Sequence, residues 1–186
     1  MTKTLLIPRR EMFAYLRSPL GSIVVGAALL VDGILFYWTG LTQKLLSAQV
    51  LQQFFYNASG VTMIAAIALS MRLVAEERQT GTFTLLNTVP IRDREIVLGK
   101  FLSAFGLLVV MTLLTIYMPL LILVNGKVSW GHILVGYTGL LLLGAAATAI
   151  GLFASTLARS QVVAVIIAAL IIAPLILLWM VAKAVD

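Results

Sequence analysis

Five long apolar runs constrain the fold of this 186-residue chain more than any other feature. A helix rises about 1.5 Å per residue and the hydrocarbon core of a bilayer is about 30 Å thick, so roughly 20 apolar residues cross it once. Helices satisfy their own backbone hydrogen bonds, which a bilayer requires. The sequence therefore predicts an all-α, polytopic membrane helix bundle formed by a single transmembrane domain over residues 1–186. The predicted spans are residues 21–40, 58–74, 101–124, 133–157 and 162–181.

The composition excludes several other classes of protein. Hydrophobic residues make up 61% of the chain and charged residues only 11%, whereas a soluble domain is about one quarter charged. Long stretches carry no Lys or Arg, which argues against a nucleic-acid partner. The chain has no Cys and one His, so it lacks the residues for disulfides, thiolate metal sites or sites with several His. We expect no metal site and no catalytic residue in this chain.

The placement of the basic residues predicts the orientation, because Lys and Arg accumulate on the cytosolic side of a membrane. With the N-terminus in the cytosol, ten of the 13 basic residues lie on that side and three on the other. The ten are Lys3, Arg9, Arg10, Arg17, Arg72, Arg78, Arg92, Arg94, Lys100 and Arg159, and the three are Lys44, Lys127 and Lys183. We expect a multi-pass protein of the bacterial inner membrane with a cytosolic N-terminus.

The segment before the first span, residues 5–18, predicts an interfacial helix. Met12, Phe13 and Leu16 share one side at helical spacing, while Arg10 falls on another side. Such a helix lies in the headgroup plane, where its Arg residues meet anionic lipid. The alternative is that these Arg residues only supply flanking charge for orientation.

The loop between the second and third spans, residues 75–100, predicts a protein-binding element. It holds four acidic and four basic residues, and such mixed charge suits a protein partner better than lipid. Thr82 can cap a short helix that Pro90 ends, lying across the cytosolic mouth of the bundle. The residues expected to couple to a partner are Glu76, Glu77, Arg78, Gly81, Thr82, Phe83, Leu85, Leu86 and Pro90.

Residues 76–101 resemble the cytosolic signature of type-2 ABC exporter permeases, most closely those associated with gliding motility and copper-enzyme maturation. The matching residues are Glu76, Glu77, Arg78, Gly81, Thr82, Leu85, Leu86, Pro90, Ile96, Gly99 and Lys100. The N-terminal stretch that ends in Arg-Ser-Pro-Leu is similar to the connecting helix of the same family. This chain departs from the family pattern at Thr84, where Glu is common, and in its five spans, where the family has six. A further span after residue 181 is expected, with a five-span protein as the alternative.

The resemblance implies a function and a set of partners. Two permease subunits would pair in the membrane as a homodimer or heterodimer. Two ATPase subunits would bind below them, and the short coupling helix of each permease would fit a cleft in an ATPase. ATP and Mg would be held by the ATPase, with no cofactor bound by this chain. Membrane lipid and an extracytoplasmic partner complete the expected partners, and lipid, peptide, polysaccharide and drug all fit as the substrate.

The chain itself lacks the phosphate loop of an ATPase. That loop reads Gly-x-x-x-x-Gly-Lys followed by Ser or Thr, because its backbone amides cradle the phosphates. The two Gly-Lys pairs end at Lys100 and Lys127, and Phe101 and Val128 follow them. We therefore expect ATP hydrolysis on a separate subunit.

Asp32 is the acidic residue that lies well inside a predicted span. A carboxylate in a bilayer costs about 3 kcal/mol on insertion scales, so it should face protein or a wet cavity. Asp32 is therefore the candidate for the transport path, and the alternative function is an ion-coupled secondary transporter or channel that uses it. The structural alternative is an Asp hydrogen-bonded by Tyr37, Thr39 or a neighbouring subunit. The first and second spans are the expected dimer seam.

Small residues form a stripe along the fourth span. Gly144, Thr148, Gly151 and Ser155 are spaced by four, three and four residues. Small side chains let membrane helices approach closely. The stripe predicts helix packing within the subunit, and the alternative is a substrate groove.

Overall fold

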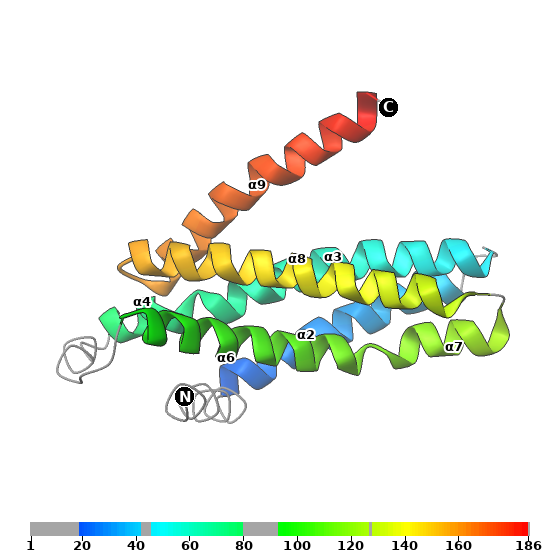
Figure 1. The fold of residues 1–186 in the computed structure, drawn as a ribbon, viewed down its shortest axis with the longest axis horizontal. Helices are drawn as coiled ribbons and strands as arrows, with labels where there is room; N and C mark the ends of the chain where they lie inside the picture. The colour runs from blue at the N-terminus through cyan, green and yellow to red at the C-terminus, as the bar shows by residue number, and fades with distance from the viewer. Residues whose placement is uncertain (1–18, 42–45, 80–92, 127, 186) are drawn as a thin grey trace.

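The computed structural model describes residues 19–41, 46–79, 93–126 and 128–185 of the chain. All regular structure in these ranges is helical (Figure 1). The elements are α2 (Pro19–Phe36), η1 (Tyr37–Leu41), α3 (Ser47–Ser70), α4 (Arg72–Gln79), α6 (Asp93–Leu114), α7 (Tyr117–Asn125), α8 (Trp130–Leu157) and α9 (Gln161–Val185). The predicted interfacial helix over residues 5–18 lies outside the described residues.

Within the described residues, five helical segments are long and apolar enough to cross a bilayer, which confirms the all-α polytopic bundle. They are Gly21–Gly40, Ser47–Ala75, Arg94–Val124, Trp130–Leu157 and Gln161–Ala184.

The second and third spans are longer than the sequence predicted. Residues 47–57, which lie outside the predicted second span, form the first turns of α3. Val50, Leu51 and Phe54 are buried there against α7 and α8, so this glutamine-rich stretch is an amphipathic part of a spanning helix. The third span begins at the start of α6, several residues before 101.

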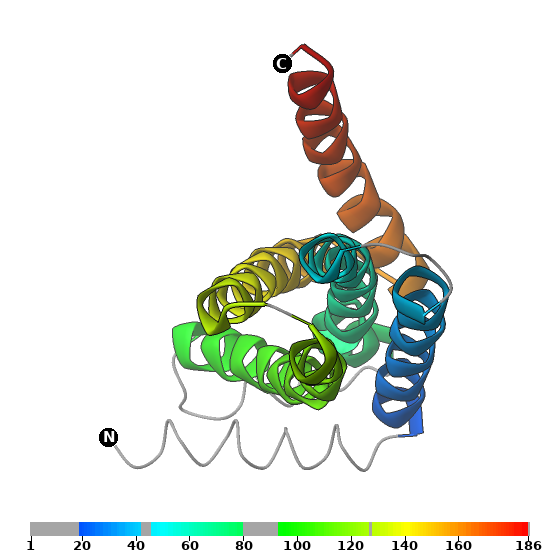
Figure 2. The same ribbon diagram turned by 90° about the vertical axis from the view of Figure 1, so that its right-hand side faces the viewer.

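The helix α3 is the centre of the subunit. Of the 18 consecutive residues that form the apolar part of its span, 56% are buried. The corresponding buried share is 17% for the spans of α2 and α9. Figures 1 and 2 show α2, α3, α6–α7 and α8 running side by side as one bundle. The other helices of the same subunit therefore cover about half of this span, while Tyr56 and Ile64 remain exposed. The expectation that the first and second spans form a dimer seam stays a prediction.

The helix α9 starts against the bundle and then diverges from it (Figures 1 and 2). Ala164, Ala168 and Ile172 are buried, whereas residues 173–184 are all exposed. Small alanine side chains let the first half of α9 approach closely. The diverging half stays linked to α3 by the rings of Trp179 and Tyr56, whose centroids are 6.2 Å apart.

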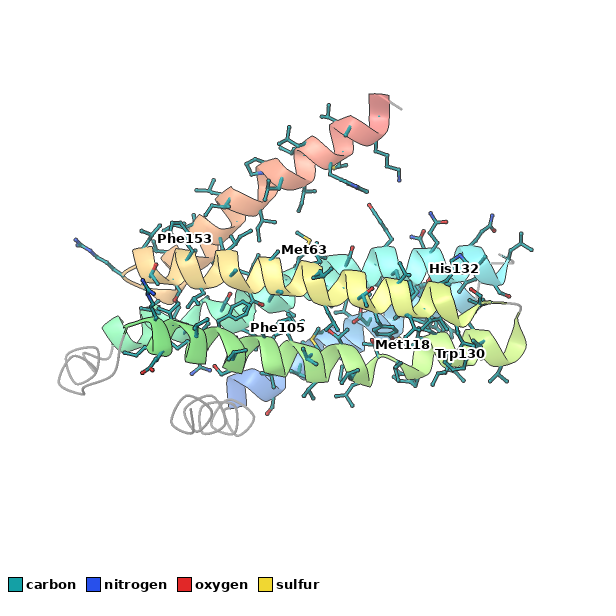
Figure 3. The ribbon with its side chains drawn as sticks, viewed as in Figure 1. Met63, Phe105, Met118, Trp130, His132 and Phe153 are labelled. Atoms are coloured by element: carbon teal, nitrogen blue, oxygen red, sulfur yellow. The ribbon has the colours of Figure 1, made fainter. Side chains whose placement is uncertain are left out.

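The two ends of the bundle differ in character. One end, called the basic end, gathers α4, the start of α6 and the turn between α8 and α9, with Arg72, Arg94, Lys100 and Arg159. The opposite, aromatic end carries the exposed rings of Tyr37, Trp38 and Trp130, and Figure 3 shows Trp130 there. Trp and Tyr favour membrane interfaces. The distribution of basic residues makes the basic end the expected cytosolic end.

Candidate functional site

The helix that leaves the second span toward the loop over residues 75–100 has a break in its hydrogen bonding after Met71, although Met71 keeps α-helical backbone angles and its N–H donates to Ile67 O. The helix α3 ends at Ser70 and α4 begins at Arg72, although neither Gly nor Pro occurs at the break. The backbone N–H groups of Val74 and Ala75 donate instead to Ser155 Oγ of α8, at 3.1 and 3.0 Å. A side chain inserted between the N–H and C=O groups of successive turns is a known cause of helix kinks.

The Ser155 hydroxyl is fully used at this break. In an unbroken helix the Ala75 N–H would bond directly to the Met71 carbonyl. Ser155 Oγ lies between these two groups, because it accepts from Ala75 and donates to Met71 O at 2.9 Å. A hydroxyl has one donor and two acceptor positions, and Ser155 fills all three when Val74 is included. The first turn of α4 is therefore completed by a side chain from α8.

Lys100 of α6 holds the same turn from another side. Its Nζ donates to Leu73 O at 2.6 Å, and the side chain is only 5% exposed. A hydrogen bond from a charged donor is about twice as strong as a neutral one. We call this arrangement of Ser155, Lys100 and the Met71 break the junction, since it joins α4 to α8 and α6.

The small-residue stripe of α8 lies inside the subunit and brings Ser155 to the junction. A Cβ atom added to Gly151 would collide with Ser70 Oγ and lie 2.9 Å from Ser70 Cβ. A Cβ added to Gly144 would lie 2.6 Å from a methyl group of Leu108. Thr148 is buried between them and donates to Gly144 O at 2.7 Å. All four stripe residues therefore face neighbouring helices of the same chain.

The residues expected to couple to a partner fall into two groups. Glu76, Glu77 and Arg78 lie on α4, directly after the junction. The others lie outside the described residues, namely Gly81, Thr82, Phe83, Leu85, Leu86 and Pro90. The helix α4 reaches Gln79, so helical structure continues beyond the end of the predicted second span.

Asp32 lies in the bundle, away from the junction, and is buried. The two local partners expected for it are not in place. Thr39 donates its hydroxyl to Leu35 O at 2.7 Å, within its own helix, and the ring of Tyr37 is exposed. The polar group that interacts with Asp32 is the Tyr137 hydroxyl, which comes from α8.

The sequence does not predict the junction. Lys100 is expected there as a cytosolic basic residue, as a match to the exporter signature and as the end of a Gly-Lys pair, and Ser155 as a small residue of the stripe. None of these expectations predicts a contact with α4. The available signal was that a Lys and a Ser interrupt two apolar runs near their basic ends.

Comparison with known proteins assigns the chain to a family. No curated protein and no solved structure matches it. The family model described as "ABC-2 family transporter protein" matches residues 13–185, which is nearly the whole chain. The chain therefore belongs to the ABC-2 transporter family, as a multi-pass permease subunit of an ABC transporter rather than an enzyme.

Proposed function

We propose that this chain is the permease subunit of an ATP-driven exporter in the inner membrane, and that α4 transmits the work of a partner ATPase to the bundle. Family membership implies ABC ATPase subunits as partners. ATP and Mg bind to the ATPase, and two permease subunits pair above two ATPase subunits. The N-terminus and the basic end face the cytosol.

The junction is the observation that carries this proposal. The helix α4 leads directly into the loop whose residues match the exporter signature. It continues α3 along the chain, bonds α8 through Ser155 and bonds α6 through Lys100. A displacement of α4 by a bound ATPase therefore acts on three spans together.

The packing at the junction suits transmission of force. Ser155, Lys100 and Leu73 are buried, and buried hydrogen-bonded groups are costly to separate, at about 1 to 3 kcal/mol for each group left unsatisfied. Closely packed interiors change between discrete arrangements rather than deforming continuously. The spans are therefore expected to move with α4 as linked bodies.

Co-purification with an ATPase tests the proposal. We expect the full chain to form a stable complex with the phosphate-loop ATPase expressed beside it, and to increase its ATP turnover. Gly81→Pro and Glu77→Ala should lower this stimulation strongly, because they alter the loop that contacts the ATPase. Gly60→Ala serves as a control, since a Cβ added at Gly60 has no atom within 4 Å. Unchanged assembly and turnover in both loop variants would refute the assignment of the loop.

A further inference from the structure

Three buried polar side chains form a cluster inside the bundle, away from the junction. Asp32 of α2, Thr115 between α6 and α7, and Tyr137 of α8 are 3%, 2% and 8% exposed. Thr115 Oγ1 and the Tyr137 hydroxyl are 3.2 Å apart, and Asp32 lies within electrostatic range of Tyr137. At this level α2 faces α7, because a Cβ added to Gly33 would lie 3.8 Å from Met118 Cε, and Figure 3 shows Met118 in the half of the bundle toward the aromatic end.

The hydroxyl protons of this cluster already form hydrogen bonds, so the oxygen atoms that remain available can only accept. Thr115 Oγ1 donates its proton to Thr112 O at 2.8 Å, so the Tyr137 hydroxyl is the donor in the bond between Tyr137 and Thr115. Neither hydroxyl has a proton left for Asp32. Among the described residues, no group forms a hydrogen bond to the Asp32 carboxylate.

Positive charge from the described side chains lies elsewhere. Arg72, Arg94, Lys100 and Arg159 are at the basic end. Lys183 of α9 lies 5.4 Å from the centroid of the Trp179 ring. A buried carboxylate without a cation or donor is unfavourable in a membrane. The cluster therefore lacks a positively charged or proton-donating group in the described part of the chain.

A helix discontinuity lies beside the cluster. Thr115 and Ile116 separate α6 from α7, and the local bonds follow a three-residue spacing, from Thr115 N to Thr112 O and from Met118 N to Thr115 O. Pro119 has no N–H to offer Thr115 O. In transporters, broken membrane helices contribute backbone carbonyls to cation sites near the middle of the bilayer.

Aromatic rings close the cluster on the side toward the aromatic end. Phe36 follows Asp32 by one helical turn, and its ring centroid is 6.0 Å from that of Phe54. The contacts continue from Phe54 to Phe55 at 5.2 Å and from Phe55 to Tyr137 at 5.5 Å. These rings shield the cluster from the exposed end of the bundle.

The geometry points to a membrane-embedded binding site for one positive charge, formed by Asp32, Thr115 and Tyr137. The carboxylate supplies the compensating charge, and the lone pairs of the hydroxyl oxygens supply further ligands. The cation is an inorganic monovalent ion or an ammonium group of a transported molecule. This inference does not depend on an ATPase partner, and its test needs none.

The test is the melting temperature of the purified full chain in nanodiscs. It is measured in sodium, potassium, propylammonium and N-methylglucamine chloride at equal ionic strength. At saturation a bound small cation should raise the melting temperature by about 3 to 10 °C over N-methylglucamine, which is too bulky for a buried site. A response to sodium or potassium identifies an inorganic ion, and a response to propylammonium alone identifies an ammonium group.

Two variants and one control decide the result. Asp32→Asn keeps the size of the side chain and should abolish the response. Glu95→Gln removes a carboxylate from the first turns of α6, at the basic end, and should keep it. Tyr137→Phe should raise the cation concentration at half effect about tenfold, by the loss of one ligand, and it decides the matter if Asp32→Asn does not fold. Absence of any response in the unmodified chain, or an equal response in Asp32→Asn or Tyr137→Phe, would overturn the site.

Discussion

Replacing Gly151 by leucine is expected to destabilise the folded subunit by about 4 kcal/mol, the largest effect of any single substitution proposed for this chain. A Cβ at this position collides with Ser70 Oγ and lies 3.7 Å from the Cα atom of Ile67. The helices cannot separate freely, because Ser155 lies one turn along α8 and bonds the backbone of α4. Overpacking and the loss of these bonds therefore act together.

The fourth span offers a matched control for this prediction. Gly139 lies on the same helix and is exposed, and a Cβ added there has no atom within 4 Å. Gly151→Leu should lower the melting temperature by about 8 to 16 °C, measured by size-exclusion chromatography after heating. Gly139→Leu should change it little. Equal melting temperatures for the two variants would show that α3 and α8 do not meet closely at Gly151.

Two smaller substitutions that should compensate for each other test the contact between Gly151 and Ser70 directly. Gly151→Ala places the colliding Cβ without the bulk of leucine, and Ser70→Gly removes the side chain that it meets. Ser70→Gly also removes a hydrogen bond from Ser70 Oγ to Ala66 O. We expect the double variant to be more stable than the sum of the two single effects predicts, which a double-mutant cycle measures. Strict additivity would place the two residues out of contact.

The spans could be predicted from the sequence because a bilayer demands long apolar runs. Their lengths were harder to predict. In α3, Gln49, Gln52 and Gln53 lower the average hydropathy of the first turns. The buried residues Val50 and Phe54 recur every four residues among them, and this periodicity marks an amphipathic helix.

The two helix breaks differ in how far the sequence could reveal them. Pro119 is a local signal for the break at Thr115, because it has no N–H for the helical bond to Thr115 O, which accepts from Met118 N–H instead. The break at Met71 has only a weak local signal, Ser70, whose hydroxyl donates back to Ala66 O, a pattern that often bends helices. The group that takes over the freed N–H groups is Ser155, which is 81 residues from Val74 in sequence, and only the packing of α8 on α3 brings them together. For the same reason, partners sought for Asp32 within its own helix were wrong, since the groups near it come from other elements.

The second large effect is expected for a substitution of Lys100. It should impair the transmission of movement from α4 to the spans rather than the folding of the subunit. Lys100→Met keeps the length and apolar stem of the side chain and removes the charged donor to Leu73 O. A hydrogen bond to a charged group contributes about 1.5 to 3 kcal/mol. If the bond between Lys100 and Leu73 O forms in only one of two arrangements of the subunit, removing it shifts the equilibrium between the two arrangements by about tenfold or more. The variant should still fold and bind the ATPase.

Transmission is measured as a distance change at the aromatic end when the ATPase binds ATP. The chain has no native Cys, so two introduced cysteines can carry spin labels without background. Leu134 on α8 and Val124 on α7 are exposed positions for them. We expect ATP to change the distance between these labels in the unmodified complex. The change should be largely lost in Lys100→Met combined with Ser155→Ala, because α4 is then released from both α6 and α8.

Arg94→Met is the matched control for this result. Arg94 is an exposed basic residue on the same helix and at the same end as Lys100, so its loss removes equal charge and leaves the junction intact. The ATP-dependent change should persist in this variant. A full change in the doubly altered chain, with the ATPase still bound, would show that force reaches the spans by another route. Failure of any ATPase to bind the unmodified chain would instead refute the proposed function and leave the geometry of the junction untouched.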